Sequence, residues 1–196
     1  MSSRRSTASW STARRFAAGW SAAATLLLAA FVAVDAGARV FYSEREALDL
    51  AFPDADEVAS HTYVLDEDQV SSIESLAKSK LDSKLVTIYT GLHEGKVLGY
   101  ALIDVHTVRT LPEAFMVVLN PAGEVRSLRV LAFHEPLEYK PTDRWYREFE
   151  NRSIGAPLRV GGDIHGVVGA TLSTHATTSG VRRALAYYEV LLRNGN

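Results

Sequence analysis

A glycine-rich segment near the C-terminus combines the residue types that bind a phosphate group. From Gly161 to Thr174 the sequence reads GGDIHGVVGATLST, and three more hydroxyl residues follow at positions 177 to 179. Glycine and alanine beside Thr171 remove side-chain bulk, so a ligand could approach the backbone closely. Hydroxyls and free amide groups where a helix begins can bind negative charge. The segment therefore predicts a phosphate site, although the same hydroxyls could form a loop that only caps a helix.

The other residues that could do chemistry form no catalytic or metal-binding set. The six histidines include no pair at helical metal-ligand spacing, and no Ser-His-Asp arrangement or pair of carboxylates can be assigned. Cysteine is absent, which excludes disulfides, thiolate metal sites and thiol nucleophiles. Any redox chemistry would therefore use a bound organic cofactor.

Two further places are candidates for ligand contacts. His134 and Glu135 stand at the end of a predicted strand, where sites are commonly built, and a simple surface pair is the equal alternative. Arg109 lies between two predicted strands. It could neutralise a phosphate, whereas an exposed arginine in such a connection is usually solvated.

Length and composition indicate one globular domain with a short attachment. The chain has 196 residues, of which 47% are hydrophobic and 22% are charged. The formal net charge is −2 and the basic residues form no long stripe, so nucleic acid is not an expected partner.

The N-terminal region predicts a membrane anchor. The 19 residues from Phe16 to Val34 carry no charge and, at about 1.5 Å each, nearly span a hydrocarbon core of about 30 Å. Four arginines precede this run: Arg4, Arg5, Arg14 and Arg15. The positive-inside rule then predicts a basic cytoplasmic tail at 1–15, a single transmembrane helix at 16–36 in the inner membrane and a periplasmic domain at 40–196. A signal peptide cleaved near Ala36-Gly37-Ala38 is the alternative, with the same destination.

The patterns along the chain predict an α+β fold. This fold is an antiparallel sheet flanked by helices and preceded by the transmembrane helix. Ser43 and Glu46 have capping-box spacing before a helix that Pro53 ends, and a second helix is expected after Asp66 with Leu81 in its buried stripe. Strands are expected at 85–90, 96–107, 114–120 and 125–133, joined by short turns. A short helix should follow Pro141, and a last helix should run from about residue 179 to 192.

Several motifs together resemble the FMN-binding domain family, found in the G subunit of Rnf electron-transport complexes and the C subunit of the sodium-pumping NADH:quinone oxidoreductase. Gly169-Ala170-Thr171-Leu172-Ser173 before an amphipathic helix resembles the flavin-attachment motif of that family. The segment from Ala47 to Val58 resembles its first helix and the exit from it. His134-Glu135-Pro136, followed by Trp145 and Phe149, resembles its His-x-Glu segment. The similarity extends from about Tyr42 to Leu192.

The resemblance implies that the domain carries FMN and that a flavin transferase esterifies its phosphate to Thr171. Two positions depart from the usual motif, which has Ser or Thr in place of Val168 and an acidic residue in place of His165. Asp163, two positions earlier, could substitute for that acidic residue. Covalent and noncovalent attachment therefore both stay open. The residues expected at the cofactor are Gly169, Ala170, Thr171, Ser173, Thr174, His134 and Glu135.

These expectations lead to a first hypothesis of a membrane-anchored periplasmic flavoprotein that carries electrons between a membrane partner and an extracytoplasmic acceptor. Its partners would be redox proteins and the flavin transferase. A cofactor-free periplasmic binding or assembly module that keeps the fold is the alternative, and a flavoenzyme with its own small substrate is a third.

Overall fold

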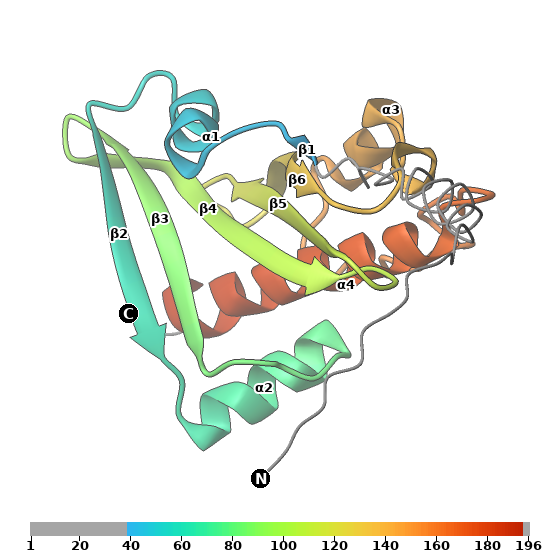
Figure 1. Ribbon diagram of the computed structural model, residues 1–196. Coiled ribbons are helices and arrows are strands. Elements are labelled where there is room, and N and C mark those ends of the chain that lie inside the picture. The colour runs from blue at the N-terminus through green and yellow to red at the C-terminus, as the bar shows by residue number, and fades with distance from the viewer. Residues whose placement is uncertain (1–38, 194–196) are drawn as a thin grey trace, which may run out of the picture. The chain divides into compact units, whose positions relative to one another are not determined.

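The protein forms a six-stranded antiparallel sheet with helices on both faces, as seen in a computed structural model that describes residues 39–193 (Figure 1). The strand order is β1-β6-β5-β4-β3-β2. The strands are β1 (Arg39–Val40), β2 (Glu57–Val64), β3 (Leu85–His93), β4 (Lys96–Thr107), β5 (Pro112–Leu119) and β6 (Val125–Phe133). The predicted α+β class and its antiparallel sheet are confirmed.

The helices follow the order α1 (Glu44–Ala51), α2 (Glu67–Ala77), α3 (Asp143–Tyr146) and α4 (Thr171–Tyr187). Two 3₁₀ turns, Leu137–Tyr139 and Arg147–Phe149, flank α3, and a π-helical turn, Tyr188–Arg193, ends α4. In residues 39–193 no helix is both long and apolar enough to span a bilayer. The transmembrane segment predicted at 16–36 lies outside the described residues.

The central strand β5 separates two hydrophobic cores. Phe115, Val117 and Leu119 point to one face, where α2 and α4 cover them, and Met116 and Val118 point to the other face, where α1 packs. All five side chains are at most 2% exposed. Because neighbouring side chains of a strand alternate between faces, a strand buried on both sides needs the continuous apolar run that this sequence has.

The first two helices begin at capping boxes. In α1 the Ser43 hydroxyl accepts the Glu46 N–H, and the Glu46 carboxylate accepts the Ser43 N–H, as the sequence predicts. Asp66 and Gln69 form the same reciprocal pair before α2. Each box provides acceptors for amides that a helix cannot pair internally, which sets where the helix begins. Leu81, expected on the second helix, lies beyond its end and packs against the larger core.

The last helix begins eight residues earlier than predicted, at Thr171 instead of residue 179. The hydroxyl residues that resemble a loop are inside the helix, and four of them are buried: Ser173, Thr174, Thr177 and Thr178. Thr174 donates its hydroxyl to the carbonyl of Thr171 at 2.8 Å, and Thr178 donates to the carbonyl of Thr174 at 2.6 Å. Since each hydroxyl bonds to the preceding helical turn, these polar residues can be buried within the helix.

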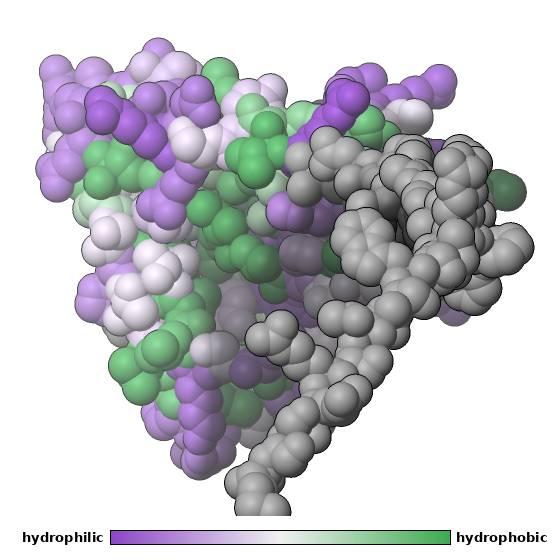
Figure 2. Space-filling view, viewed as in Figure 1, coloured by the Kyte–Doolittle hydropathy of each residue, from purple (hydrophilic) through white to green (hydrophobic). Residues whose placement is uncertain are grey.

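Strand β2 was not among the predicted strands. It is the edge strand opposite β1, pairs only with β3, and most of its side chains are exposed on both faces. On the face drawn in Figure 2, apolar residues in green are interspersed with polar residues in purple. A strand that buries few side chains has no alternating apolar pattern by which sequence could predict it.

Candidate functional site

A cavity of about 170 Å³ lies at the beginning of α4. One wall is the run Gly169–Ser173, and the other comes from the β4–β5 connection and the segment after β6. The contributors from that second wall are Val108, Arg109, Glu135 and Tyr139. The cavity therefore joins three regions that are far apart in the sequence, including the glycine-rich segment predicted to bind phosphate.

The α4 helix begins without a side-chain cap. Ala170 occupies the N-cap position and makes no capping hydrogen bond, and the first amide that donates within the helix is that of Thr174, to the Ala170 carbonyl at 2.9 Å. The amides of Thr171, Leu172 and Ser173 precede it, on residues that line the cavity. An uncapped helix N-terminus of this kind leaves N–H donors and positive partial charge for an anion.

Gly169 makes the turn into the helix possible. Its φ is +85°, and no atom lies within 4 Å of the position that a Cβ would occupy. Only glycine adopts this conformation without strain, so its requirement comes from the backbone and not from lack of space. The turn leads directly into Ala170 and the first residues of α4, which line the cavity.

Ser173 adds a buried hydroxyl to the same wall. The residue is 1% exposed and its Oγ has no hydrogen-bond partner among the described residues, as is also true of Thr177 Oγ1 one turn later. A buried hydroxyl without a partner costs free energy.

Glu135 holds the opposite wall in shape. Its Oε1 accepts the backbone N–H groups of Arg109 at 3.2 Å, Thr110 at 2.7 Å and Leu111 at 2.8 Å. The bonds from Thr110 and Leu111 lower the pKa of the Glu135 carboxyl, because they favour its charged form. Glu135 thus fixes the turn that carries Val108 and Arg109 to the cavity.

The predicted cofactor residues divide into two groups. Gly169, Ala170, Thr171, Ser173 and Glu135 line the cavity together. Thr174 is fully buried, with its hydroxyl on the Thr171 carbonyl, and His134 is half-buried beside the cavity-lining Glu135; neither lines the cavity.

Sequence reasoning also missed part of the lining. The cavity includes Arg109, for which a solvated role was the alternative. It also includes Leu172, from the motif around Thr171, and Val108 and Tyr139, none of which was among the predicted cofactor residues.

Glu148 lies beside His165, the position at which the flavin-attachment motif described above usually has an acidic residue. Glu148 Oε2 accepts the backbone N–H of His165 at 2.8 Å and lies 3.1 Å from its Nδ1, while Trp145 donates its indole N–H to the His165 carbonyl. Asp163 is engaged elsewhere, because its carboxylate accepts the amides of Leu158 and Arg159. Glu148, and not Asp163, is the carboxylate beside position 165.

A second polar cluster lies buried between the sheet and α4. His106 Nδ1 is 2.7 Å from Asp104 Oδ1, and His106 Nε2 is 3.3 Å from Glu113 Oε2 across the β4–β5 pair. Burial by itself lowers the pKa of His106, but the hydrogen bond with Asp104 and the nearby Glu113 carboxylate outweigh burial and raise this pKa to about 9. Burial and the nearby Glu113 charge raise the pKa of Tyr146. No sequence motif indicated this cluster.

Comparison of the sequence with models of known protein families gives no match, and neither does comparison with curated proteins. In residues 39–193 no group of three or more His, Asp or Glu side chains is arranged to hold a metal ion. The hydrogen-bond donors at the cavity are the uncapped amides, hydroxyls and one guanidinium. This set suits an oxyanion.

Proposed function

We propose that this protein is a membrane-anchored periplasmic flavoprotein that carries electrons through FMN bound at the start of α4. The proposal rests on one observation: the uncapped N-terminus of α4, with Thr171 and Ser173, lines one cavity together with Arg109 of the β4–β5 connection. This donor set matches the charge and geometry of a phosphate monoester.

The cavity would take the phosphate end of FMN, and its rim would take the ring. Thr171, Ser173 and Arg109 would hold the phosphate. A cavity of about 170 Å³ has no room for a tricyclic ring as well, so the ring would lie at the rim beside Val108, Tyr139 and Leu172. Leu172 is 53% exposed, which leaves an apolar surface for a planar ring to cover.

The flavin, when bound, supplies one- and two-electron transfer. The chain itself binds and orients it. Arg109 contributes positive charge that favours anionic forms of the cofactor, and Glu135 keeps Arg109 in place through the backbone of its turn. A ring at an exposed rim is open to redox partners, and the expected anchor at 16–36 would keep the domain near a membrane partner.

Thr171 is the attachment residue if the phosphate is esterified, because its side chain is exposed at the cavity. Glu148 supports recognition by the flavin transferase, since it supplies the acidic group that His165 lacks. Val168 is fully exposed and supplies no hydroxyl. The proposal therefore includes noncovalent FMN in the same cavity.

The test is to export the full-length chain together with a flavin transferase and to record its visible flavin absorbance and intact mass. We expect bound FMN in the wild-type protein and loss of any covalent flavin in Thr171→Val, which keeps the shape but not the hydroxyl. Thr62→Val, at an exposed position of β2, is the matched control.

A wild-type protein that stays colourless and takes up no added FMN would overturn the proposal. That result would favour the cofactor-free binding or assembly module.

A further inference from the structure

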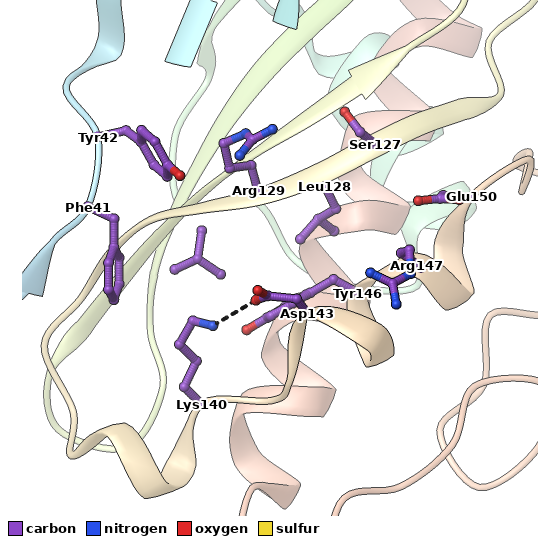
Figure 3. A pocket seen from close by; sticks show the side chains of 11 residues that line it. Phe41, Tyr42, Ser127, Leu128, Arg129, Lys140, Asp143, Tyr146, Arg147 and Glu150 are labelled. Atoms are coloured by element: carbon purple, nitrogen blue, oxygen red, sulfur yellow. Dashed lines mark hydrogen bonds and ion pairs between the residues drawn. The ribbon is translucent and has the colours of Figure 1, made fainter. Parts of the chain in front are cut away.

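A second cavity, of about 410 Å³, lies at the outer edge of β6 (Figure 3). It exists because β1 is only two residues long. The β1 strand pairs with Ala132 and Phe133, so Ser127–Val130 have no strand on their outer side among residues 39–193. The segment from Lys140 to Glu150 forms the opposite wall.

Three cationic side chains line this cavity: Arg129, Lys140 and Arg147. Aromatic rings support two of them. The Arg129 guanidinium lies 5.3 Å from the centre of the Tyr42 ring, and Lys140 Nζ lies 5.3 Å from the Tyr146 ring and 5.9 Å from the Phe41 ring. Ring faces attract a cation without using its N–H donors. Lys140 Nζ also donates to the Pro141 carbonyl at 3.4 Å and to Asp143 at 3.3 Å, both long contacts that a ligand anion could replace.

Few carboxylates neutralise these cations. Lys140 has an ion pair with Asp143 at 3.3 Å, but the Asp143 side chain is 89% exposed, so the pair is weak (Figure 3). In the described part of the chain neither Arg129 nor Arg147 forms an ion pair within 4 Å. With Asp143 and Glu150 as the two acidic lining residues, the cavity has one net positive charge.

Ser127, two tyrosines and three apolar residues complete the lining. Phe41, Leu128 and Val130 face the cavity beside the cations. The volume exceeds what a bare phosphate or sulfate fills, and the apolar side chains would contact the organic part of a larger ligand. Cations next to apolar walls select a molecule that has an anionic group at one end and an apolar body at the other.

We propose that this cavity is a second ligand site, which binds a small organic phosphate through Arg129, Lys140 and Arg147. The site does not depend on the flavin proposal. It shares no lining residue with the cavity at α4, although Tyr139 of that cavity and Lys140 of this one are neighbours in the chain.

Phenyl phosphate is the probe, because it joins a dianion to a flat apolar ring, and its binding to the full-length chain is measured by calorimetry. We expect saturable binding that added salt weakens. Arg129→Gln combined with Lys140→Gln should lower the affinity by about tenfold or more, since each lost charged hydrogen bond is expected to weaken binding. Arg129→Lys, which keeps the charge, should retain most of the affinity.

Two control variants test whether phenyl phosphate binds in this cavity. Arg126→Gln removes another β6 arginine, which stacks on Phe52 outside the cavity, and should bind phenyl phosphate like the wild type. Thr171→Val, which alters only the α4 cavity, should keep the component of binding that the Gln double variant loses, and this distinguishes the two sites. Each variant is first checked for wild-type thermal unfolding.

Phenol that binds as tightly as phenyl phosphate would overturn the proposal, because the anion would then contribute nothing. Unchanged affinity in the folded Gln double variant, or no binding to the wild type, would overturn it as well.

Discussion

Arg183 of α4 forms a two-pronged ion pair with Asp104 of β4, with Nε 2.9 Å from Oδ2 and Nη2 2.8 Å from Oδ1. Both side chains are mostly buried, at 16% and 14% exposure. Burial would raise the pKa of Asp104, but the hydrogen bond from His106 and the Arg183 charge outweigh it and lower this pKa. The pair attaches the helix that lines the α4 cavity to the centre of the sheet.

Removal of Arg183 should destabilise the fold. Arg183→Met leaves Asp104 buried with only His106 as a partner, and we expect the free energy of unfolding to fall by about 3 kcal/mol. Denaturant unfolding at neutral pH measures this change. Arg193→Met, which removes an exposed pair with Glu189, should cost less than about 0.5 kcal/mol. Equal effects of the two substitutions would contradict a structural role for the buried pair.

The stability should decrease as the pH rises above neutrality. The pKa of His106 is raised to about 9 in the folded protein from the ordinary value of 6.5, so its stabilisation is complete below pH 6.5 and is lost as the pH rises through 9. The loss amounts to at most about 3 kcal/mol. The groups that face His106 are Asp104, Glu113 and the Phe115 ring.

Denaturant unfolding from pH 6 to 10 tests this dependence in the wild type and in His106→Asn. The variant should be less stable at pH 6 and should show a flatter profile across that range. Parallel profiles for the two proteins would show that another group titrates.

Gly180 is a packing requirement of the same interface. A Cβ there would lie 2.4 Å from Phe115 Cζ and 2.9 Å from Asp104 Oδ1. Gly180→Ala should therefore lower stability by about 1–3 kcal/mol, although alanine favours helices. Gly166→Ala is the control, because its Cβ would meet only Val160, at 3.8 Å. Thermal unfolding of both variants measures the difference; a stabilised Gly180→Ala protein would refute the packing argument.

Glu135 should control the order of the turn that carries Arg109. Glu135→Ala leaves the amides of Arg109, Thr110 and Leu111 without their acceptor, and we expect a loss of roughly 2 kcal/mol in stability. Hydrogen exchange gives the local measurement, since the Thr110 and Leu111 amides should exchange faster. Glu138→Ala, at an exposed neighbouring position, should leave their exchange unchanged.

The amino-acid sequence alone predicted the features that depend on residues close together in the chain. The apolar run of β5 predicted a strand, and Ser43 and Glu46 predicted the start of α1. The small residues before Thr171 predicted a phosphate site, and a cavity lies at that segment. Each of these follows from local rules: burial alternates along a strand, a capping box pairs residues three apart, and glycine permits a positive φ.

Features that depend on residues far apart in the chain could be seen only in the folded structure. The early start of α4 requires that Thr174 and Thr178 be buried against the sheet, and the edge strand β2 exists because β3 offers it hydrogen bonds. Asp104 and Arg183 meet across 79 positions, and Tyr139 reaches the cavity of Thr171 from a separate segment. Such contacts depend on how the elements pack, and residue spacing along the chain carries no record of that packing.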